Sequence, residues 1–336
     1  MLDSMLGQLA AGTDLSLEEM SDAIDAIMQG RCTEGEIGLL LTGLRFKGET
    51  VAEIAGAATA MRRHMVRIRT SRSGVIDTCG PGGVHSGTFN ISTAAALVTA
   101  AAGVPVAKHG NRRVTSKTGS ADALAALGVN IQADVPTVEA CLDQLGICFC
   151  FAPLMHPAMK QVAAVRQKLG MPTIFNLLGP LTNPAGARFQ LLGVGQPDLR
   201  PKLAAALQLL GSERALVVGG DDGLGEVTLT GTTQGIEVSP GRLAEFTWQP
   251  EDFGLPPASL TPLLVETPEQ SAAAIRGVLG GEIGPRRDIV VLNAAAAILT
   301  ARPQSTPHAA ATVAATAIDS GAALELLNKL VDLSYA

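Results

Sequence analysis

The regular alternation of strand-like and helical segments after residue 74 is the feature that most constrains how this chain can fold. Five apolar strand candidates are separated by helical candidates. The strand candidates span 74–78, 104–108, 147–151, 189–194 and 214–218, and the helical ones span 92–102, 119–127, 136–145, 157–169 and 198–210. Such alternation produces right-handed crossovers and a mainly parallel sheet. Because sites in these sheets lie beyond the carboxyl ends of the strands, the residues just after each strand are the candidates for function.

The first 70 residues follow a different pattern, which predicts a small helical domain. Helical apolar spacing runs through 16–28, 33–44 and 50–65, and a Ser or Thr opens each segment. Beyond Gly219, short strands are predicted at 226–229 and 235–239, and helices at 268–280, 286–301, 307–319 and 320–332. We therefore expect a helical N-terminal domain over residues 1–70 and a larger α/β domain with a mainly parallel central sheet over residues 71–336.

Composition argues against several classes of protein. The 336 residues carry a net charge of −6, so the chain lacks the basic surface expected of a nucleic-acid-binding protein. The first 30 residues do not resemble a signal peptide, and the most apolar segment, 93–106, is too short to cross a membrane. The five cysteines show no paired CxxC spacing, which favours buried free thiols and a cytoplasmic location. We expect neither a nucleic acid nor a membrane as a partner.

A glycine-rich turn between the strand 74–78 and the helix 92–102 indicates an anion site. Glycines at 80, 82 and 83 let a ligand approach the backbone, and Asn90-Ile91-Ser92-Thr93 opens the helix, whose first N–H groups carry partial positive charge. The next strand ends in Lys108-His109-Gly110-Asn111-Arg112-Arg113, which supplies countercharge. The turn is neither a dinucleotide fingerprint, because His85 stands where a glycine is needed, nor a Walker loop. The pattern predicts a phosphate-rich substrate.

The same residues resemble the anthranilate phosphoribosyltransferase family. The family pattern GTGGDG, N-[IV]-S-T, KHGNR and Gly-Ser-Ala-Asp corresponds here to GPGGVH at 80–85, NIST at 90–93, KHGNR at 108–112 and GSAD at 119–122. The resemblance continues through MHPAMK at 155–160, Val165-Arg166 and the highly specific FNLLGPLTNP at 175–184. It implies a nucleoside phosphorylase/phosphoribosyltransferase-like fold. It also implies transfer of the phosphoribosyl group from phosphoribosyl pyrophosphate to the amine of anthranilate, giving N-(5-phosphoribosyl)anthranilate and pyrophosphate in tryptophan biosynthesis.

The resemblance further implies a Mg²⁺ cofactor, a homodimer formed through the helical domain, and a set of substrate-binding residues. These are Gly80, Gly82, Gly83, Thr88, Asn90, Ile91, Ser92, Thr93, Lys108, His109, Gly110, Asn111, Arg112, Ser116, Ser120, His156, Arg166 and Pro180. Ser92 and Glu226 would contact the metal. Asn111 and Arg166 would hold anthranilate, Arg166 through the carboxylate, which suits its planar fork. No catalytic acid or base is expected, because the amine is already a nucleophile and positioning with electrostatics dominates.

The interpretation of two of these side chains stays open from the residues alone. A packing histidine and a ligand contact are about equally favoured for His156, and a surface salt bridge is the alternative for Arg166.

Three departures from the family pattern bear on the metal. Val84 and Gly225 replace two acidic residues, Glu226 remains, and Pro81 removes a backbone N–H. We therefore predict weak metal dependence or a raised Mg²⁺ requirement, unless Asp221, Asp222 or His85 compensates. Two other hypotheses stay open: a catalytically weakened or inactive paralogue that binds a ligand or nucleic acid, and a transferase with a different aromatic acceptor.

Overall fold

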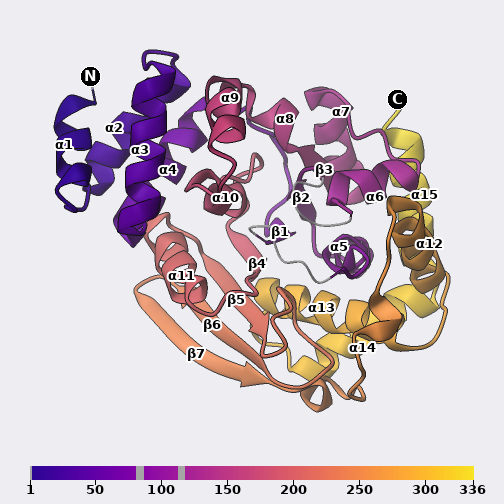
Figure 1. The fold of residues 1–336 in the computed structure, drawn as a ribbon. Coiled ribbons are helices and arrows are strands. Elements are labelled where there is room, and N and C mark those ends of the chain that lie inside the picture. The colour runs from indigo at the N-terminus through magenta and orange to yellow at the C-terminus, as the bar shows by residue number, and fades with distance from the viewer. Residues whose placement is uncertain (1, 81–86, 113–117) are drawn as a thin grey trace.

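The computed structural model describes residues 2–80, 87–112 and 118–336. Its N-terminal part is a bundle of four helices at one side of the molecule (Figure 1). They are α1 (Asp3–Ala10), α2 (Leu17–Met28), α3 (Glu34–Lys47) and α4 (Val51–His64). Capping boxes start the last three, with Ser16, Thr33 and Thr50 each paired to a Glu three residues on. The sequence prediction missed α1, which is short and lacks a side-chain cap.

A seven-stranded sheet forms the centre of the larger domain. Its strands are β1 (Ile76–Cys79), β2 (Val106–Gly110), β3 (Ile147–Phe151), β4 (Phe189–Gly193), β5 (Arg214–Gly220), β6 (Thr233–Ser239) and β7 (Arg242–Trp248). The order is β3-β2-β1-β4-β5-β6-β7. The first five strands are parallel, and β6 and β7 add antiparallel pairs. The chain winds one way from β1 to β3 and the other way from β4 onward, so a crevice opens at the carboxyl ends of β1 and β4. The predicted mainly parallel sheet is confirmed.

The strand predicted at 226–229 is wrong. The backbone there is paired with side chains instead of a neighbouring strand: Val227 N donates to Asn293 Oδ1 and Val227 O accepts from Asn293 Nδ2, each at 2.9 Å. Thr228 N donates to Thr233 Oγ1 at 3.0 Å. The neighbours of β6 are instead β5 and β7, and the sequence prediction missed β7.

Helices cover both faces of the sheet. They are α5 (Ile91–Ala101), α6 (Ser120–Ala126), α7 (Val135–Ala140), α8 (Ala152–Met155), α9 (Lys160–Leu169), α10 (Phe175–Leu178), α11 (Leu199–Leu209), α12 (Pro268–Leu279), α13 (Pro285–Ala301), α14 (Pro307–Asp319) and α15 (Ala322–Leu333). The predicted helix 136–145 is α7 followed by a π turn at Cys141–Leu145. In the described part of the chain no single helix is long and apolar enough to cross a membrane, although α14 and α15, bent by 63°, pass by length and composition together.

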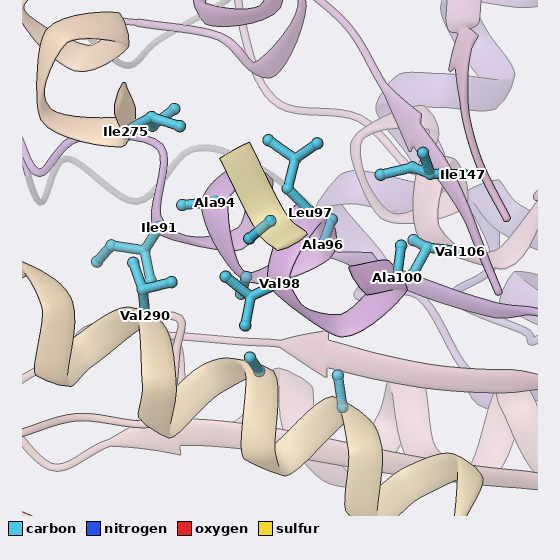
Figure 2. Close-up of a cluster of buried hydrophobic side chains, with 14 of the residues drawn as sticks. Ile91, Ala94, Ala96, Leu97, Val98, Ala100, Val106, Ile147, Ile275 and Val290 are labelled. Atoms are coloured by element: carbon cyan, nitrogen blue, oxygen red, sulfur yellow. The ribbon is translucent and has the colours of Figure 1, made fainter. Parts of the chain in front are cut away.

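Two hydrophobic clusters hold these layers together. In the first, the Ala-rich α5 lies beside α13, and small side chains such as Ala94 let Ile91 and Val98 pack near Val290 (Figure 2). The second joins the helical bundle to α9, α10 and α11. Alternate residues of β4 serve the two clusters, Leu191 the first and Leu192 the second, as the two-residue period of a strand requires. The helical bundle therefore shares its core with the wall of the crevice.

Candidate functional site

One cavity of about 680 Å³ occupies the crevice at the ends of β1, β2 and β4. Most of the residues predicted for the substrate or metal site line it: Gly80, Thr88, Asn90, Ile91, Ser92, Lys108, His109, Gly110, Asn111, Arg112, Ser120, His156, Arg166, Pro180 and Glu226. Thr93 does not, because it lies inside α5 and is buried. Gly82, Gly83 and Ser116, together with Pro81, Val84 and His85, fall outside the described residues.

The charge of the lining suits an anionic ligand. Over the described residues, Lys108, Arg112, Lys160 and Arg166 contribute four cations to the wall, and Glu226 is the one carboxylate there. This excess of positive charge contrasts with the net charge of −6 for the whole chain. The cavity therefore concentrates positive potential that the rest of the surface does not have.

The side chain of Lys108 extends from β2 to the first turn of α5. Its Nζ donates to Ser92 Oγ at 3.2 Å and to the Thr78 carbonyl at 2.5 Å, which leaves one of its three N–H groups for a ligand. Burial lowers the pKa of Lys108, and electrostatic interactions with Asp77 and, more weakly, with Cys79 and Glu226 oppose that shift. An ammonium held in this way next to the start of α5 is suited to a phosphate group.

Asn90 fixes the start of α5 by tying it to two other segments. Its Oδ1 accepts hydrogen bonds from Thr118 Oγ1 at 2.9 Å and from Ser271 Oγ at 2.8 Å, and its own N–H donates to Ser271 Oγ at 3.0 Å. The backbone at Gly80 is fixed by crowding, because a Cβ there would lie 2.6 Å from the Gly193 carbonyl oxygen. Both ends of the glycine turn are thus held by the surrounding fold.

Arg166, on α9, also lines the cavity. Its Nη2 donates to Asn176 Oδ1 at 3.4 Å, and its guanidinium carbon lies 5.7 Å from the centre of the Phe175 ring. Burial lowers the pKa of Arg166, which nevertheless stays cationic. No carboxylate of the described chain lies within ion-pair distance of it, so the surface salt bridge considered for Arg166 is wrong. Its charge is left for a ligand.

His109 and His156 also line the cavity. Their Nε2 atoms are 3.2 Å apart, and His109 Nδ1 bonds the Gly179 carbonyl at 2.9 Å. Burial lowers the pKa of His109 to about 3, helped by the neighbouring His156, and burial lowers the pKa of His156 to about 4 against a hydrogen bond to the Thr182 backbone. Both rings are therefore neutral at physiological pH. His156 is at once a buried packing residue and a wall of the cavity, so both interpretations of it hold.

Glu226 and Ser92 are the residues that fit a metal. Burial raises the pKa of Glu226 to about 7, while the charge of Lys108 and a hydrogen bond to the Ser92 backbone oppose that rise. Within the described chain no group of three or more His, Cys, Asp and Glu residues could hold an ion alone. One carboxylate with a hydroxyl still fits Mg²⁺, which usually takes one or two protein carboxylates and completes its shell with water and substrate phosphates.

The compensation considered for Asp221 and Asp222 is not what the structure shows. Asp222 Oδ2 accepts from Thr228 Oγ1 and Thr230 Oγ1, each at 2.6 Å, and its Oδ1 accepts from Leu224 N at 2.9 Å. Asp221 accepts from Gln234 Nε2 at 3.4 Å. Both carboxylates stabilise their own loop, and neither lines the cavity. His85 lies outside the described residues.

Sequence reasoning missed several residues of the wall. Phe175, Asn176, Gly179 and Thr182 belong to the FNLLGPLTNP motif and line the cavity, although only Pro180 of that motif was selected as a site residue. The motif itself was the signal. Cys79, at the end of β1, also lines the cavity.

Comparison with known proteins agrees with this geometry. Residues 72–324 match the model of the glycosyl transferase family a/b domain, and residues 4–65 match the model of its helical bundle domain. The chain is 50% identical over 321 residues to the anthranilate phosphoribosyltransferase of Rhodopirellula baltica, covering 96% of this chain and 94% of the relative. It is 49% identical to that of Moorella thermoacetica, covering 98% of each.

Solved structures give the same result. The crystal structure of anthranilate phosphoribosyltransferase from Thermus thermophilus superimposes with a TM-score of 0.93 at 41% identity, over 98% of this chain and 99% of that one. The Saccharomyces cerevisiae enzyme in complex with phosphoribosyl pyrophosphate and Mg superimposes with a TM-score of 0.90 at 29% identity, over 99% and 98%. The same yeast enzyme in complex with 4-fluoroanthranilate gives a TM-score of 0.88 at 28% identity, over 99% and 97%.

Proposed function

The chain belongs to the anthranilate phosphoribosyltransferases of the glycosyl transferase family, and from that premise we propose that it joins the amine of anthranilate to C1 of phosphoribosyl pyrophosphate. The products are N-(5-phosphoribosyl)anthranilate and pyrophosphate, and the reaction serves tryptophan biosynthesis. The observation that carries the proposal is that one cavity is lined by two separate cationic groups, Lys108 beside the start of α5 and Arg166 on α9. A donor with several phosphates fits the first group and an acceptor with one carboxylate fits the second, so we call these parts of the cavity the phosphate end and the acceptor end.

We propose that the phosphate end binds the donor through Gly80, Asn90, Ser92 and Lys108. The remaining N–H of Lys108 Nζ would donate to the pyrophosphate, and the positive end of the α5 dipole lies next to this ammonium, which contacts Ser92 in the first turn of that helix. These groups neutralise the charge that develops on the leaving group as the C1–O bond breaks, so they stabilise the transition state more than the ground state. Mg²⁺, held by Glu226 and Ser92 together with the pyrophosphate, would add charge neutralisation to the same leaving group.

The acceptor end orients the nucleophile. Arg166 and Asn111 would bind the carboxylate of anthranilate, and the neutral His109 and His156 would line its ring. Holding the carboxylate fixes the amine in the ortho position towards C1, and such positioning alone lowers the barrier by several kcal/mol. As the C1–N bond forms and the C1–O bond breaks, the pyrophosphate leaves with the electron pair, and the nitrogen gives one proton to the departing pyrophosphate or to water. No side chain has to act as a strong base, because the aromatic amine is a nucleophile when neutral.

Product identification tests this function. The purified chain is incubated with phosphoribosyl pyrophosphate, Mg²⁺ and either anthranilate or aniline, and the products are separated and weighed by mass spectrometry. We expect the phosphoribosylated amine and pyrophosphate from anthranilate, and far less product from aniline, which lacks the carboxylate that Arg166 would bind. Equal use of aniline would instead favour a transferase with a different acceptor. Binding of both substrates without product would favour the weakened paralogue, which the low number of carboxylates at the metal site makes the second candidate.

We also propose that the two domains have the separate roles expected from the sequence. Residues 1–70 would form the wall of the cleft and the dimer surface, and residues 71–336 would carry the phosphoribosyl pyrophosphate site. The exposed Leu39 and Phe46 of α3, with 64% and 83% of their surface accessible, support a homodimer through this helix. Light scattering of Phe46→Glu, which should shift the chain towards a monomer, tests it. We also propose a cytoplasmic location, which the free cysteines favour.

A further inference from the structure

The turn Gly179–Thr182 is a point where four distant elements meet. Three of its carbonyl oxygens each accept a hydrogen bond from a different side chain: Gly179 O from His109 Nδ1 at 2.9 Å, Pro180 O from Gln190 Nε2 at 2.6 Å, and Leu181 O from Arg62 Nε at 2.7 Å. A fourth side chain, His156, contacts His109 through the two Nε2 atoms. His109 and Gln190 come from β2 and β4 of the sheet, and Arg62 comes from α4 of the helical bundle.

The turn determines where the protons lie on the two histidines. A carbonyl oxygen only accepts, so the Gly179 contact requires a proton on Nδ1 of His109 and leaves its Nε2 bare while the ring is neutral. The 3.2 Å contact between the two Nε2 atoms is then a hydrogen bond only when His156 donates from Nε2, which is the tautomer that we assign to it. If the Gly179 carbonyl moved away, His109 would no longer be held in the Nδ1-protonated form, and either tautomer could be populated.

Arg62 is the residue that holds the turn from the helical bundle. Its side chain leaves α4, donates to Leu181 O, and also donates from Nη1 to Leu210 O at the end of α11, at 3.2 Å. Within the described residues it has no carboxylate partner, and burial lowers its pKa without any opposing charge. Burying half of a guanidinium without a carboxylate partner costs desolvation free energy. We therefore attribute the position of Arg62 to the two carbonyl groups that it holds in place.

We propose that Arg62 is a positioning residue for the acceptor site: from the helical bundle it holds the Gly179–Thr182 turn, and through the turn it fixes the orientation and tautomers of His109 and His156. The inference rests on the proposed function for its kinetic consequences only, since the histidine tautomers are a property of the protein without substrate. Its action is confined to the acceptor end, because the Lys108 ammonium is held by the Thr78 carbonyl and Ser92 Oγ, and neither group belongs to the turn.

The test compares Arg62→Met with Arg63→Met, which removes the exposed neighbouring arginine of the same helix. In Arg62→Met we expect the KM for anthranilate to rise at least about tenfold, the lower end of the range for one charged hydrogen bond, while the KM for phosphoribosyl pyrophosphate stays within about twofold. Arg63→Met should match the unsubstituted chain. Equal effects on both substrates, or none, would overturn the proposal.

A second measurement does not depend on activity. The ring ¹⁵N shifts of the histidines, assigned by single substitutions, should show His109 protonated on Nδ1 and His156 on Nε2 in the unsubstituted chain and in Arg63→Met. In Arg62→Met the shifts should move towards a mixture of tautomers. If Arg62→Met does not fold, Arg62→Lys decides, because Lys reaches fewer carbonyls and should give the same pattern with smaller shifts. Unchanged tautomers with an unchanged KM for anthranilate in Arg62→Lys would contradict the proposal. A chain without transferase activity that shows the expected tautomers would instead refute the proposed function and leave the role of Arg62 intact.

Discussion

The Nε2 atoms of His109 and His156 lie 3.2 Å apart, so two buried imidazoles share one contact at the acceptor end of the cavity. With a pKa of about 3 for His109 and about 4 for His156, against 6.5 for a free ring, the folded chain resists protonation at both. As the pH falls below 6.5 the unfolded chain takes up protons that the folded chain does not. The free energy of unfolding therefore decreases from pH 6.5 down to about pH 4, and neither ring affects it above pH 7.5.

This linkage predicts a pH-dependent effect of His156→Gln. We compare the free energy of unfolding of the variant with that of the unsubstituted chain at each pH. This difference should be more favourable to the variant at pH 5 than at pH 8, by on the order of 2 kcal/mol. Urea denaturation at both pH values measures this, and His308→Gln, at an exposed histidine, is the control. The same difference at pH 5 and at pH 8 would show that His156 is not held neutral.

Arg166 is expected to set the affinity for the acceptor. Arg166→Met should lower kcat/KM for anthranilate by about tenfold to a hundredfold, the range for one charged hydrogen bond, and should leave the KM for phosphoribosyl pyrophosphate nearly unchanged. Lys168→Met is the matched control, because Lys168 lies two residues on in α9 and is paired with Glu34 at the surface. Steady-state kinetics with each substrate varied in turn separates the two constants. A larger effect on phosphoribosyl pyrophosphate than on anthranilate would mean that Arg166 lies at the other end of the reaction.

Gly110, at the end of β2, has no room for a side chain. A Cβ there would collide with Ser120 Oγ and lie 2.8 Å from Cε2 of Phe149. Gly110→Ala should therefore cost about 1–3 kcal/mol of stability and shift Asn111 away from the cavity. Gly7→Ala, in α1 with nothing within 4 Å of the added Cβ, should be neutral or slightly stabilising. Thermal unfolding of both variants checks this, and equal stability of the two would show that the strand end adapts.

We predict that adding a carboxylate to the metal site raises the affinity for Mg²⁺. Gly225 lines the cavity next to Glu226 and does not adopt a positive φ, so Asp fits its backbone. Gly225→Asp should lower the Mg²⁺ concentration at half-maximal effect by about tenfold, as expected for one added charged contact. Gly231→Asp adds the same charge away from the cavity and is the control. Stabilisation against heat by phosphoribosyl pyrophosphate, measured across a Mg²⁺ titration, gives the midpoint independently of turnover. A midpoint that Gly225→Asp does not change would mean that other groups already complete the site.

The sequence predicted the parallel part of the fold well because its signals are local. The strand at Ile147–Phe151 is a short apolar run that stands within its predicted bounds, and capping residues place the starts of α2, α3 and α4. The antiparallel edge was harder to predict. The segment at Val227 reads as a strand, but Asn293, 66 residues away, takes its backbone hydrogen bonds. A pattern of apolar residues cannot indicate which partner a backbone group finds.

In the site, too, residues marked by local sequence signals could be predicted, and residues that act through long-range contacts could not. Lys108 and Ser92 follow strand and helix boundaries, so the pattern brings them together, and their contact at 3.2 Å agrees with that expectation. The roles of Arg62, Asn176 and Gln190 could not be predicted, because each acts through a contact that only the tertiary fold creates. Arg62 is 119 residues from Leu181, whose carbonyl it holds. For Arg166, the choice between a surface salt bridge and a ligand contact depended on the structure, which shows no carboxylate partner for it within the described chain.

The most direct test of the account follows the fluorescence of anthranilate in the presence of phosphoribosyl pyrophosphate across a Mg²⁺ titration. The account predicts a decay that requires both substrates, with a Mg²⁺ midpoint that falls in Gly225→Asp. No decay at any Mg²⁺ concentration, with anthranilate still bound, would contradict the proposed transferase and leave a binding protein or a different acceptor.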